Sequence, residues 1–589
     1  MALLVDGLII ILYFVAIIWI GLYMGRREKS LHDFALGGRN VPWWAVMASI
    51  IAAETSAATF IGTPEQGYTT QGLVYVQLTI GLIIGRVIVG FVFLKPYFSY
   101  KVYTVYDYLG VRFGPASKNY VSALFLIMRT LASGVRLLVP ALVMVLAWRL
   151  FVSSPPTAGG GSGGVEFSQT SAVTSVAPYV WAIVILTVLT CLYTAIGGIK
   201  AVIWTDVIQA TLMFGSAVVA AVTLLYHIGG DSWNLLDGFR ALGSHVPTMT
   251  EAAGYVRTGV EDAAVAKWQL KTGVADMRWW NYVQLVLDSE FTIFSAILGA
   301  TAGNMAAFGT DQDMVQRMLT AQSYQKGRRS LITAALMDVP VAAIFSFIGV
   351  LLIAYYQQNP ALRPAATSDV FGAYILNGLP VVVRGLVLAG LLATAMGSLS
   401  AALNSLATSF TNDWYIPYIA RRRTEEHYVA AARVFTAVFA GLMIVVAAGF
   451  AYAKVNDPKV QIIPVALGIG NFILGPMLGV FVLGMFTRNR GSDRGNLLAI
   501  TAGLLTTIVL GGLHVELANL LSGLLGSDRR FQRPDWLPRV AFTWFALVGA
   551  TAVFLVGMLY RTPASVLEKA KARAAEAAAG EDRPIALRS

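Results

Sequence analysis

Apolar runs of about twenty residues recur along nearly the whole length of this 589-residue chain. Each run is long enough to cross the roughly 30 Å hydrocarbon core of a bilayer as a helix. Charged residues make up only 13% of the sequence, whereas a soluble domain carries about 25%. The chain therefore has too few charges to cover itself in water. The pattern predicts an all-α polytopic membrane protein.

We expect about thirteen transmembrane spans. The apolar runs that predict them lie near residues 5–25, 43–67, 71–95, 119–150, 177–198, 202–226, 281–308, 329–356, 384–414, 428–453, 460–486, 495–515 and 541–560. The first run is followed by Arg26 and Arg27 and lacks a small-residue cleavage site, which indicates a retained span and not a signal peptide. Cys191 is the only cysteine, so the sequence offers no disulfide framework and no cysteine metal site.

Lysine and arginine in the loops indicate the orientation. Basic residues follow the first, third, seventh, ninth and eleventh spans, and cytoplasmic loops are enriched in them. The loop at 152–178 has none and is rich in Gly and Ser, as expected of a flexible external connection. The loop before the last span, with four arginines, has the opposite bias. We expect a multi-pass protein of the plasma or inner membrane with its N-terminus outside and its C-terminus cytoplasmic.

The net charge of +11 is spread over these loops and does not form one basic stripe, so we expect no nucleic-acid partner. The five histidines fall in loops or at span ends. We therefore expect no catalytic residues and no intramembrane histidine relay.

Two spans are unusually polar. The second contains Glu54 and several hydroxyls, and the seventh combines Asp288 and Glu290 with Gly299 and Asn304. Polar residues at membrane depth are tolerated where they face protein or a water-lined cavity. Interrupted helices at matching positions of two halves point to an inverted-repeat transporter with its site at the midplane. The alternative for the hydroxyls is hydrogen bonding between packed helices.

The ninth span places Thr394, Ser398 and Ser405 at three- and four-residue spacings, on related helix faces. Oxygen ligands with little net charge suit a hard monovalent cation such as sodium and suit transition metals poorly. Small residues at these spacings also serve close helix packing, and this segment by itself does not decide between the two.

At these segments the chain resembles the sodium/solute symporter family, which includes sodium–glucose, sodium–proline, sialic acid, iodide and multivitamin transporters. The run from Gly197 to Gln209 is similar to the family's motif at the junction of spans five and six. Further matching segments are Phe34 to Arg39, Tyr103 to Leu109, Asp311 to Arg317, and Ser398 to Ser405.

The resemblance implies a five-plus-five inverted-repeat (LeuT-like) core with broken helices, within the thirteen or so transmembrane helices. The division it implies is an extra N-terminal span and cytoplasmic loop (1–41), a first repeat of spans two to six (42–226), an external loop (227–280), a second repeat of spans seven to eleven (281–487), two C-terminal spans (488–561) and a cytoplasmic tail (562–589).

It also implies a sodium site. The family's backbone carbonyls from the first broken helix fall on Ala52 and Thr55, and its ligands from the ninth span fall on Thr394, Gly397 and Ser398. Gly397 departs from the pattern, because the family usually has a hydroxyl there. Water, Thr394 or Glu54 would have to replace the lost ligand.

A possible second cation site, seen in some members, keeps only Asp206 and Ser400, since Gly397 and Ala401 lack the matching hydroxyls. We therefore expect one sodium ion per cycle and no other metal.

The solute is less determined. We expect the binding residues to be Glu54, Ser56, Thr59, Arg136 and Asn304. The stacking aromatic of the galactose-transporting branch falls near Ala307, so that kind of sugar pocket is not preserved. Arg136, with Arg129, would offer a guanidinium to a carboxylate; pairing with an acidic residue and reaching out to the membrane surface are the alternatives.

These features predict a secondary active transporter, not an enzyme, which carries a small organic solute together with sodium by alternating access. An organic anion, monocarboxylate or sugar acid is favoured over a neutral sugar or amino acid. The expected partners are the solute, the sodium ion and the lipid bilayer, with a monomer or weak oligomer and no cofactor beyond Na+ as coupling ion. The alternatives are a proton-coupled or uncoupled transporter using Glu54, a membrane enzyme, and a transporter-like sensor.

Overall fold

The computed structural model describes residues 2–25, 30–70, 72–152, 175–245, 265–266, 269, 277–456, 462–524, 531–534 and 537–578. Within these residues the chain is helical, and the only β-type pairings are two isolated bridges. The Gly/Ser-rich stretch at 159–164, much of the predicted external loop at 227–280 and the end of the tail at 562–589 lie outside the described residues.

Among the described residues, eight helical segments are long and apolar enough to cross a membrane, which confirms the all-α polytopic fold. They are Leu4–Met24, Val74–Ser99, Pro115–Val145, Ala177–Ile228, Tyr324–Gln358, Val383–Ile419, Glu425–Ala453 and Asp493–Gly511. The exact count of thirteen spans stays a prediction.

A ninth span is broken. It consists of α3 (Trp43–Glu54) and α4 (Ala57–Thr70), which meet at an angle of 69°. The polar run that predicted an interruption in the second span is the segment in which the two helices part. Thr55 has an extended backbone there, with φ −75° and ψ 108°.

Helix α10 (Ala177–Ile228) contains both the fifth and the sixth predicted spans. Its 52 residues would measure about 78 Å if straight, more than twice the roughly 30 Å hydrocarbon core. The helix is interrupted at Gly198, whose φ of 50° and ψ of −151° are accessible to glycine and unfavourable for residues with a side chain. The glycine pair of the family-like motif is therefore the junction between the two spans.

The chain divides into two compact units. Unit 1 comprises Met1–Val76, Arg129–Tyr255 and Gln316–Ala466. Besides α3, α4 and α10, its helices are α1 (Ala2–Met24), α2 (Leu31–Leu36), α9 (Leu138–Val152), α11 (Leu235–His245), α17 (Tyr324–Gln358), α18 (Val370–Asn377), α19 (Val383–Phe410) and α20 (Glu425–Asn456).

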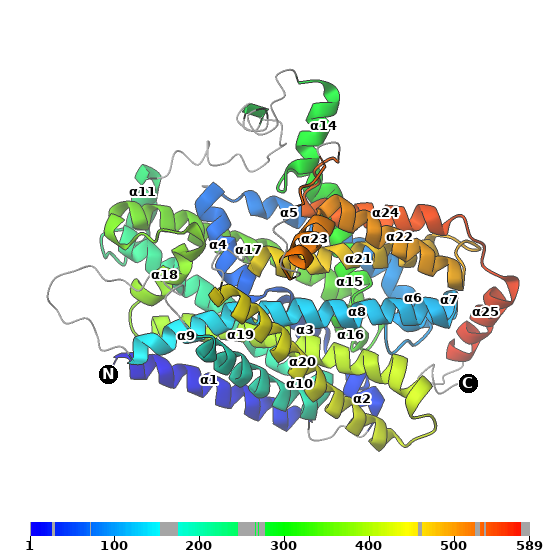
Figure 1. Ribbon diagram of the computed structural model, residues 1–589. Helices are drawn as coiled ribbons and strands as arrows, with labels where there is room; N and C mark the ends of the chain where they lie inside the picture. The colour runs from blue at the N-terminus through cyan, green and yellow to red at the C-terminus, as the bar shows by residue number, and fades with distance from the viewer. Residues whose placement is uncertain are drawn as a thin grey trace. The chain divides into compact units, whose positions relative to one another are not determined.

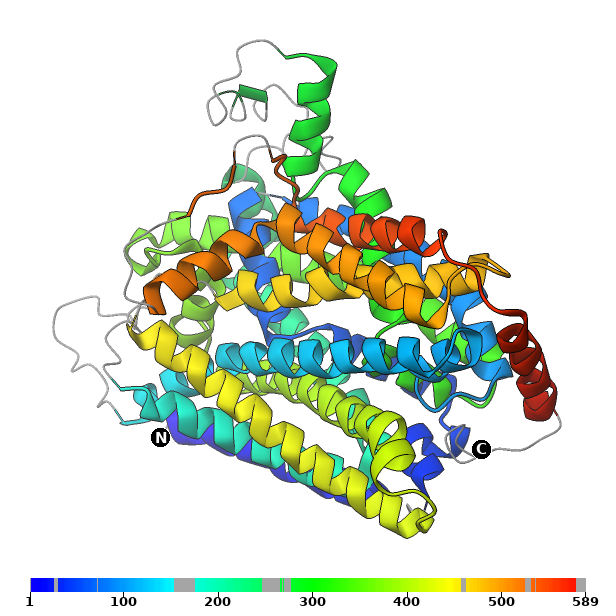
Figure 2. The same ribbon diagram turned by 45° about the vertical axis from the view of Figure 1, so that its right-hand side comes forward.

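Within unit 1, α1, α10 and α20 lie side by side, and α10 also packs along α19 (Figures 1 and 2). Small residues permit a close approach: a Cβ built on Gly25, which directly follows α1, would stand 2.2 Å from the Cα of Gly197 on α10. The N-terminal helix is therefore tightly packed against the helix that carries the family-like motif.

Unit 2 comprises Gln77–Met128, Val256–Val315 and Leu467–Ser589. Its helices are α5 (Leu78–Ile88), α6 (Leu94–Ser99), α7 (Tyr106–Arg112), α14 (Trp279–Asp288), α15 (Thr301–Gly309), α22 (Asp493–Gly511), α23 (Leu513–Leu524), α24 (Phe545–Gly557) and α25 (Ala564–Ala578). Three of the unit boundaries fall within α8 (Pro115–Arg136), α16 (Gln312–Leu319) and α21 (Ile462–Phe486).

Within unit 2, α22 and α24 lie side by side (Figure 2). The seventh predicted span is also interrupted, as its polar sequence indicated. Helix α14 ends at Asp288, and the π-helix Ser295–Ala300 precedes α15. Arg86 of α5 is fully buried here, with its guanidinium 3.9 Å from the centre of the Phe308 ring.

Candidate ion and solute site

The break between α3 and α4 interrupts the backbone hydrogen bonds of the second span. The last carbonyls of a helix have no donor within that helix, and α3 ends at Glu54. Ser56 begins the next helix, because its Oγ accepts a hydrogen bond from the Thr59 backbone N–H at 3.3 Å. The polar residues of the second span thus end one helix and start the other.

Helix α19 meets this break. The hydroxyl of Ser398 donates to the Ala53 carbonyl at 3.2 Å and lies 3.5 Å from the Thr55 carbonyl. A Cβ built on the neighbouring Gly397 would lie 3.3 Å from the Ala52 carbonyl. The structure therefore brings together Ala52, Thr55, Gly397 and Ser398 of the predicted sodium site.

Thr394, the fifth member of the predicted set, lies one turn earlier on α19. Its hydroxyl donates to the Leu391 carbonyl at 2.6 Å. This bond keeps the hydroxyl against its own helix backbone, as is usual for threonine within helices. The role implied for Thr394 by the resemblance is that of its backbone carbonyl, and this stays a prediction.

Gly397 faces two further buried oxygens, both on α10. Its Cβ position lies 3.0 Å from Gln209 Oε1 and 3.5 Å from Asp206 Oδ1. Neither oxygen receives a hydrogen bond from the part of the chain that the structure describes. Ser400, the other residue of the possible second site, donates its hydroxyl to the Gly397 carbonyl at 3.1 Å. Around Gly397, where the family usually has a hydroxyl, thus lie three oxygens that accept but do not donate: the Ala52 carbonyl, Gln209 Oε1 and Asp206 Oδ1.

The second oxygen of Asp206 is in a buried ion pair. Oδ2 accepts from Ser49 Oγ at 2.5 Å and from the Arg317 guanidinium at 3.2 Å, and Arg317 Nε donates to Ser49 at 2.9 Å. The side chains of Arg317 and Asp206 are 1% and 0% exposed. A buried carboxylate requires a partner, and Arg317 supplies it.

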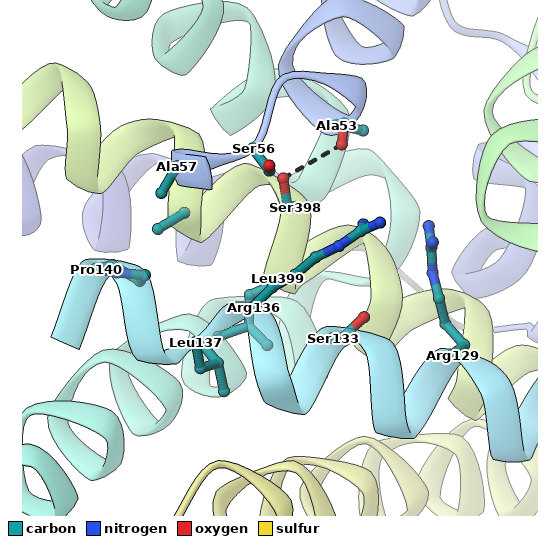
Figure 3. Close-up of a pocket in the computed structure, with 11 residues that line it drawn as sticks. Ala53, Ser56, Ala57, Arg129, Ser133, Arg136, Leu137, Pro140, Ser398 and Leu399 are labelled. Carbon is teal, nitrogen blue, oxygen red and sulfur yellow. Dashed lines mark hydrogen bonds between the residues drawn. The ribbon is translucent and has the colours of Figure 1, made fainter. Parts of the chain in front are cut away.

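A narrow cavity lies beside the Ser398 contacts, within unit 1. Arg129, Ser133 and Arg136 line it from one face of α8, at spacings of four and three residues. Figure 3 shows both guanidinium groups projecting from α8 on the side that faces Ser398 and Ala53. The two arginines place two guanidinium groups in the lining of one cavity.

The cavity measures about 20 Å³, which is room for one water molecule. An organic solute requires it to widen. The remaining lining residues are Ala53, Ser56, Ala57, Leu137, Pro140, Ala395, Ser398 and Leu399. The cavity therefore has a polar wall of two arginines and three serines and an otherwise apolar lining.

Of the predicted solute residues, Ser56 and Arg136 line this cavity. Thr59 shares a hydrogen bond with Ser56, 3.2 Å between the hydroxyl oxygens. Glu54 is the last residue of α3 and is not among the lining residues. Asn304 belongs to unit 2, where its Oδ1 accepts from Arg86 Nε at 3.4 Å and its amide donates to the Ala300 carbonyl at 2.9 Å.

The sodium:solute symporter family model matches residues 34–148 and 162–503. The chain belongs to the sodium:solute symporter family. This symporter is therefore a multi-pass membrane transporter with sodium as its coupling ion, and family membership favours sodium over a proton. Its relatives are transporters and not enzymes.

Among the relatives of this symporter, a sodium/sialic acid symporter of Proteus mirabilis is 26% identical over 550 residues, which cover 93% of this chain and 92% of the relative. A sodium/sialic acid symporter of Aliivibrio fischeri is 26% identical over 499 residues, or 84% and 85% of the two chains. A sodium/glucose cotransporter of Vibrio parahaemolyticus is 26% identical over 527 residues, or 85% and 84%.

The fold of this symporter matches a solved structure of a Na+-coupled sialic acid symporter in a substrate-bound outward-open state, with a TM-score of 0.70 and 24% identity over 94% of this chain and 97% of that one. This likeness supports the predicted LeuT-like architecture with broken helices.

Three features of the site were not predicted from the sequence. They are the contact of Ser49 with Asp206, the position of Gln209 beside Gly397, and the ion pair of Arg317 with Asp206. Gln209 and Arg317 stand at the ends of family-like motifs, and that position was the available signal. Ser49 lies one turn before Ala52 in an apolar run, and nothing in its spacing marks it.

Proposed function

We propose that this symporter carries an organic anion, a monocarboxylate or a sugar acid, together with sodium. The observation that supports it most is the pair of arginines, Arg129 and Arg136, that line one cavity together with Ser56 and Ser398. Arginine binds carboxylates through two parallel hydrogen bonds. The sialic acid symporters among the relatives are named for a solute of this class.

The proposed sodium ligands are the carbonyls of Ala52, Thr55 and Thr394 and the hydroxyl of Ser398. Ser398 lies at the junction of the ion site and the cavity, because it contacts the α3 carbonyls and also lines the cavity with Arg136. Sodium bound there would draw the α3 break and α19 together and fix the wall of the cavity. Ion and solute would then favour the same conformation, which is the requirement for positive coupling.

The cycle proposed is alternating access, with the N-terminus outside and the C-terminus in the cytoplasm. Binding of both ligands from outside, followed by rearrangement of the repeats, would expose them to a compartment where low sodium promotes release.

The test uses purified protein in proteoliposomes with an inward sodium gradient. Sialic acid, gluconate, lactate, glucose and proline are each offered as solute, with a potassium gradient as the control. We expect uptake of an anion, only with sodium. Uptake of glucose or proline in preference to every anion would refute the anionic substrate, and uptake indifferent to sodium would refute the coupling.

Arg136→Gln tests the assignment of the cavity. Loss of a charged hydrogen-bonding partner costs about 1.5–3 kcal/mol, so the solute concentration for half-maximal uptake is expected to rise about 10- to 150-fold. The matched control is Arg433→Gln, on α20, whose guanidinium is bound to the Ile196 carbonyl away from the cavity lining. An unchanged half-maximal concentration in Arg136→Gln would remove Arg136 from the site.

A further inference from the structure

The N-terminal helix α1 is bound to α19 at its outer end. Asp6 Oδ1 accepts the backbone N–H groups of Val382 and Gly385 at 2.9 and 3.1 Å, and Oδ2 accepts from the Arg384 guanidinium at 2.7 Å. A carboxylate in this position satisfies the free N–H groups of the helix start and suits its partial positive charge. Asp6 therefore fixes α1 to the start of the helix that carries Gly397 and Ser398.

Tyr13 provides a second connection, two turns further along α1. Its side chain is buried, and its hydroxyl donates to Met396 Sδ at 3.6 Å and accepts from Gln209 Nε2 at 3.4 Å. Met396 directly precedes Gly397. Gln209 is the residue whose Oε1 faces Gly397. Tyr13 thus contacts both α19 and α10 immediately behind the candidate ion site.

The Tyr13 hydroxyl acts as an acceptor toward Gln209, because its single proton is directed to Met396 Sδ. A glutamine amide has an oxygen that accepts and a nitrogen that donates, and its orientation follows from its hydrogen bonds. With Nε2 donating to Tyr13, Oε1 is held toward Gly397, beside the Ala52 carbonyl and Asp206 Oδ1. The opposite orientation would place two N–H donors there, which would repel a cation.

We propose that Tyr13 is a positioning residue for the coupling ion: through Gln209 it keeps an oxygen, and not an amide nitrogen, at the position where Gly397 lacks the family hydroxyl. In this symporter the helix ahead of the inverted repeat thereby sets the affinity for sodium. The inference rests on the proposed function, because it concerns the same ion site.

The experiment compares Tyr13→Phe with wild type. Phenylalanine keeps the buried ring and removes only the hydroxyl. The matched control is Tyr23→Phe on the same helix, where the side chain is 55% exposed. The measurements are the sodium concentration for half-maximal uptake in proteoliposomes, the half-maximal solute concentration at saturating sodium, and the melting temperature in sodium-free potassium buffer.

We expect Tyr13→Phe to raise the half-maximal sodium concentration about 3- to 10-fold, the range expected from one lost hydrogen bond. The half-maximal solute concentration at saturating sodium is expected to match Tyr23→Phe. A lowered melting temperature in potassium with unaltered sodium dependence would overturn the proposal, because Tyr13 would then act in packing alone.

Gln209→Leu supplies the second variant. If Tyr13 acts through the amide, Tyr13→Phe has no added effect on sodium dependence in the Gln209→Leu background. Two effects that multiply independently would overturn the proposal. Wild-type uptake that does not depend on sodium would instead refute the proposed function, so the two failures are distinguishable.

Discussion

Gly397 lacks the hydroxyl that the family usually has at this position, and it lies against the Ala52 carbonyl and Gln209 Oε1. The perturbation is a pair of substitutions, Gly397→Ala and Gly397→Ser, which add the same Cβ and differ by one hydroxyl. That Cβ would lie 3.0 Å from Gln209 Oε1 and 3.3 Å from the Ala52 carbonyl, closer than an ordinary carbon–oxygen contact of about 3.4 Å. The Gln209 side chain can move aside, but the Ala52 carbonyl belongs to the backbone of α3 and is a proposed sodium ligand.

The magnitude follows from these contacts. Overpacking costs about 1–3 kcal/mol, and the low end applies where a flexible side chain can yield. If the added Cβ destabilises the sodium-bound state by about 1 kcal/mol, Gly397→Ala binds sodium roughly 5-fold more weakly than wild type. The serine hydroxyl can donate to Gln209 Oε1 or Asp206 Oδ1 or ligate sodium, which returns about 0.5–1.5 kcal/mol. Serine is therefore expected to bind sodium about 2- to 12-fold more tightly than alanine.

The assay is the sodium dependence of thermal stabilisation of the purified protein at constant ionic strength, with potassium replacing sodium. It measures the ion without requiring the solute. Equal sodium dependence in wild type, Gly397→Ala and Gly397→Ser would refute the reasoning, because it would mean that no ion binds within reach of this position. Tighter binding by alanine than by serine would refute the hydroxyl argument specifically.

Two further predictions concern neighbouring residues. Ser398→Ala removes the hydroxyl that contacts the Ala53 and Thr55 carbonyls, and we expect the half-maximal sodium concentration for uptake to rise about 3- to 10-fold; an unaltered value would exclude Ser398 as a ligand. Arg317→Met leaves the Asp206 carboxylate buried without its cation, at a cost of about 3–5 kcal/mol, so we expect the melting temperature to fall sharply. The double variant Arg317→Met/Asp206→Asn should recover part of that loss. A double variant no more stable than Arg317→Met would mean that the lost ion pair is not the cause.

Much of the fold could be predicted from the sequence because hydrophobic length and polar interruption are local properties. The residues around Glu54 that made the second span a poor bilayer helix are those at which α3 and α4 part. Gly197 and Gly198 likewise indicated the junction inside α10, where Gly198 has a backbone conformation that requires glycine. The number of spans does not follow from hydrophobic length alone, because α10 contains two predicted spans and the seventh predicted span is divided between the short helices α14 and α15.

The site was predicted only in part, for a physical reason. The resemblance supplied Ala52, Gly397 and Ser398, which the structure places together. It could not supply Tyr13 or Ser49. Their contacts depend on which helices pack together behind the site and on the position along each helix axis at which the side chains come into contact. Such contacts join residues more than a hundred positions apart, and no spacing within one span encodes them.

The ion pair of Asp206 bears on how many cations the site can hold. A second cation at Asp206 Oδ1 would share the carboxylate with the Arg317 guanidinium, and repulsion between two buried positive charges amounts to a few kcal/mol even at an effective dielectric constant of about 20. Gly397 and Ala401 offer no hydroxyl to offset that repulsion. The arrangement therefore favours a single sodium ion.

One sodium ion moving with one monovalent anion carries no net charge, so the sodium gradient and not the membrane potential would drive uptake. With a neutral solute the same single ion would carry one charge, and uptake would respond to the potential. The sensitivity of transport to membrane potential thus reports the charge of the solute, which the two arginines of the cavity predict to be negative.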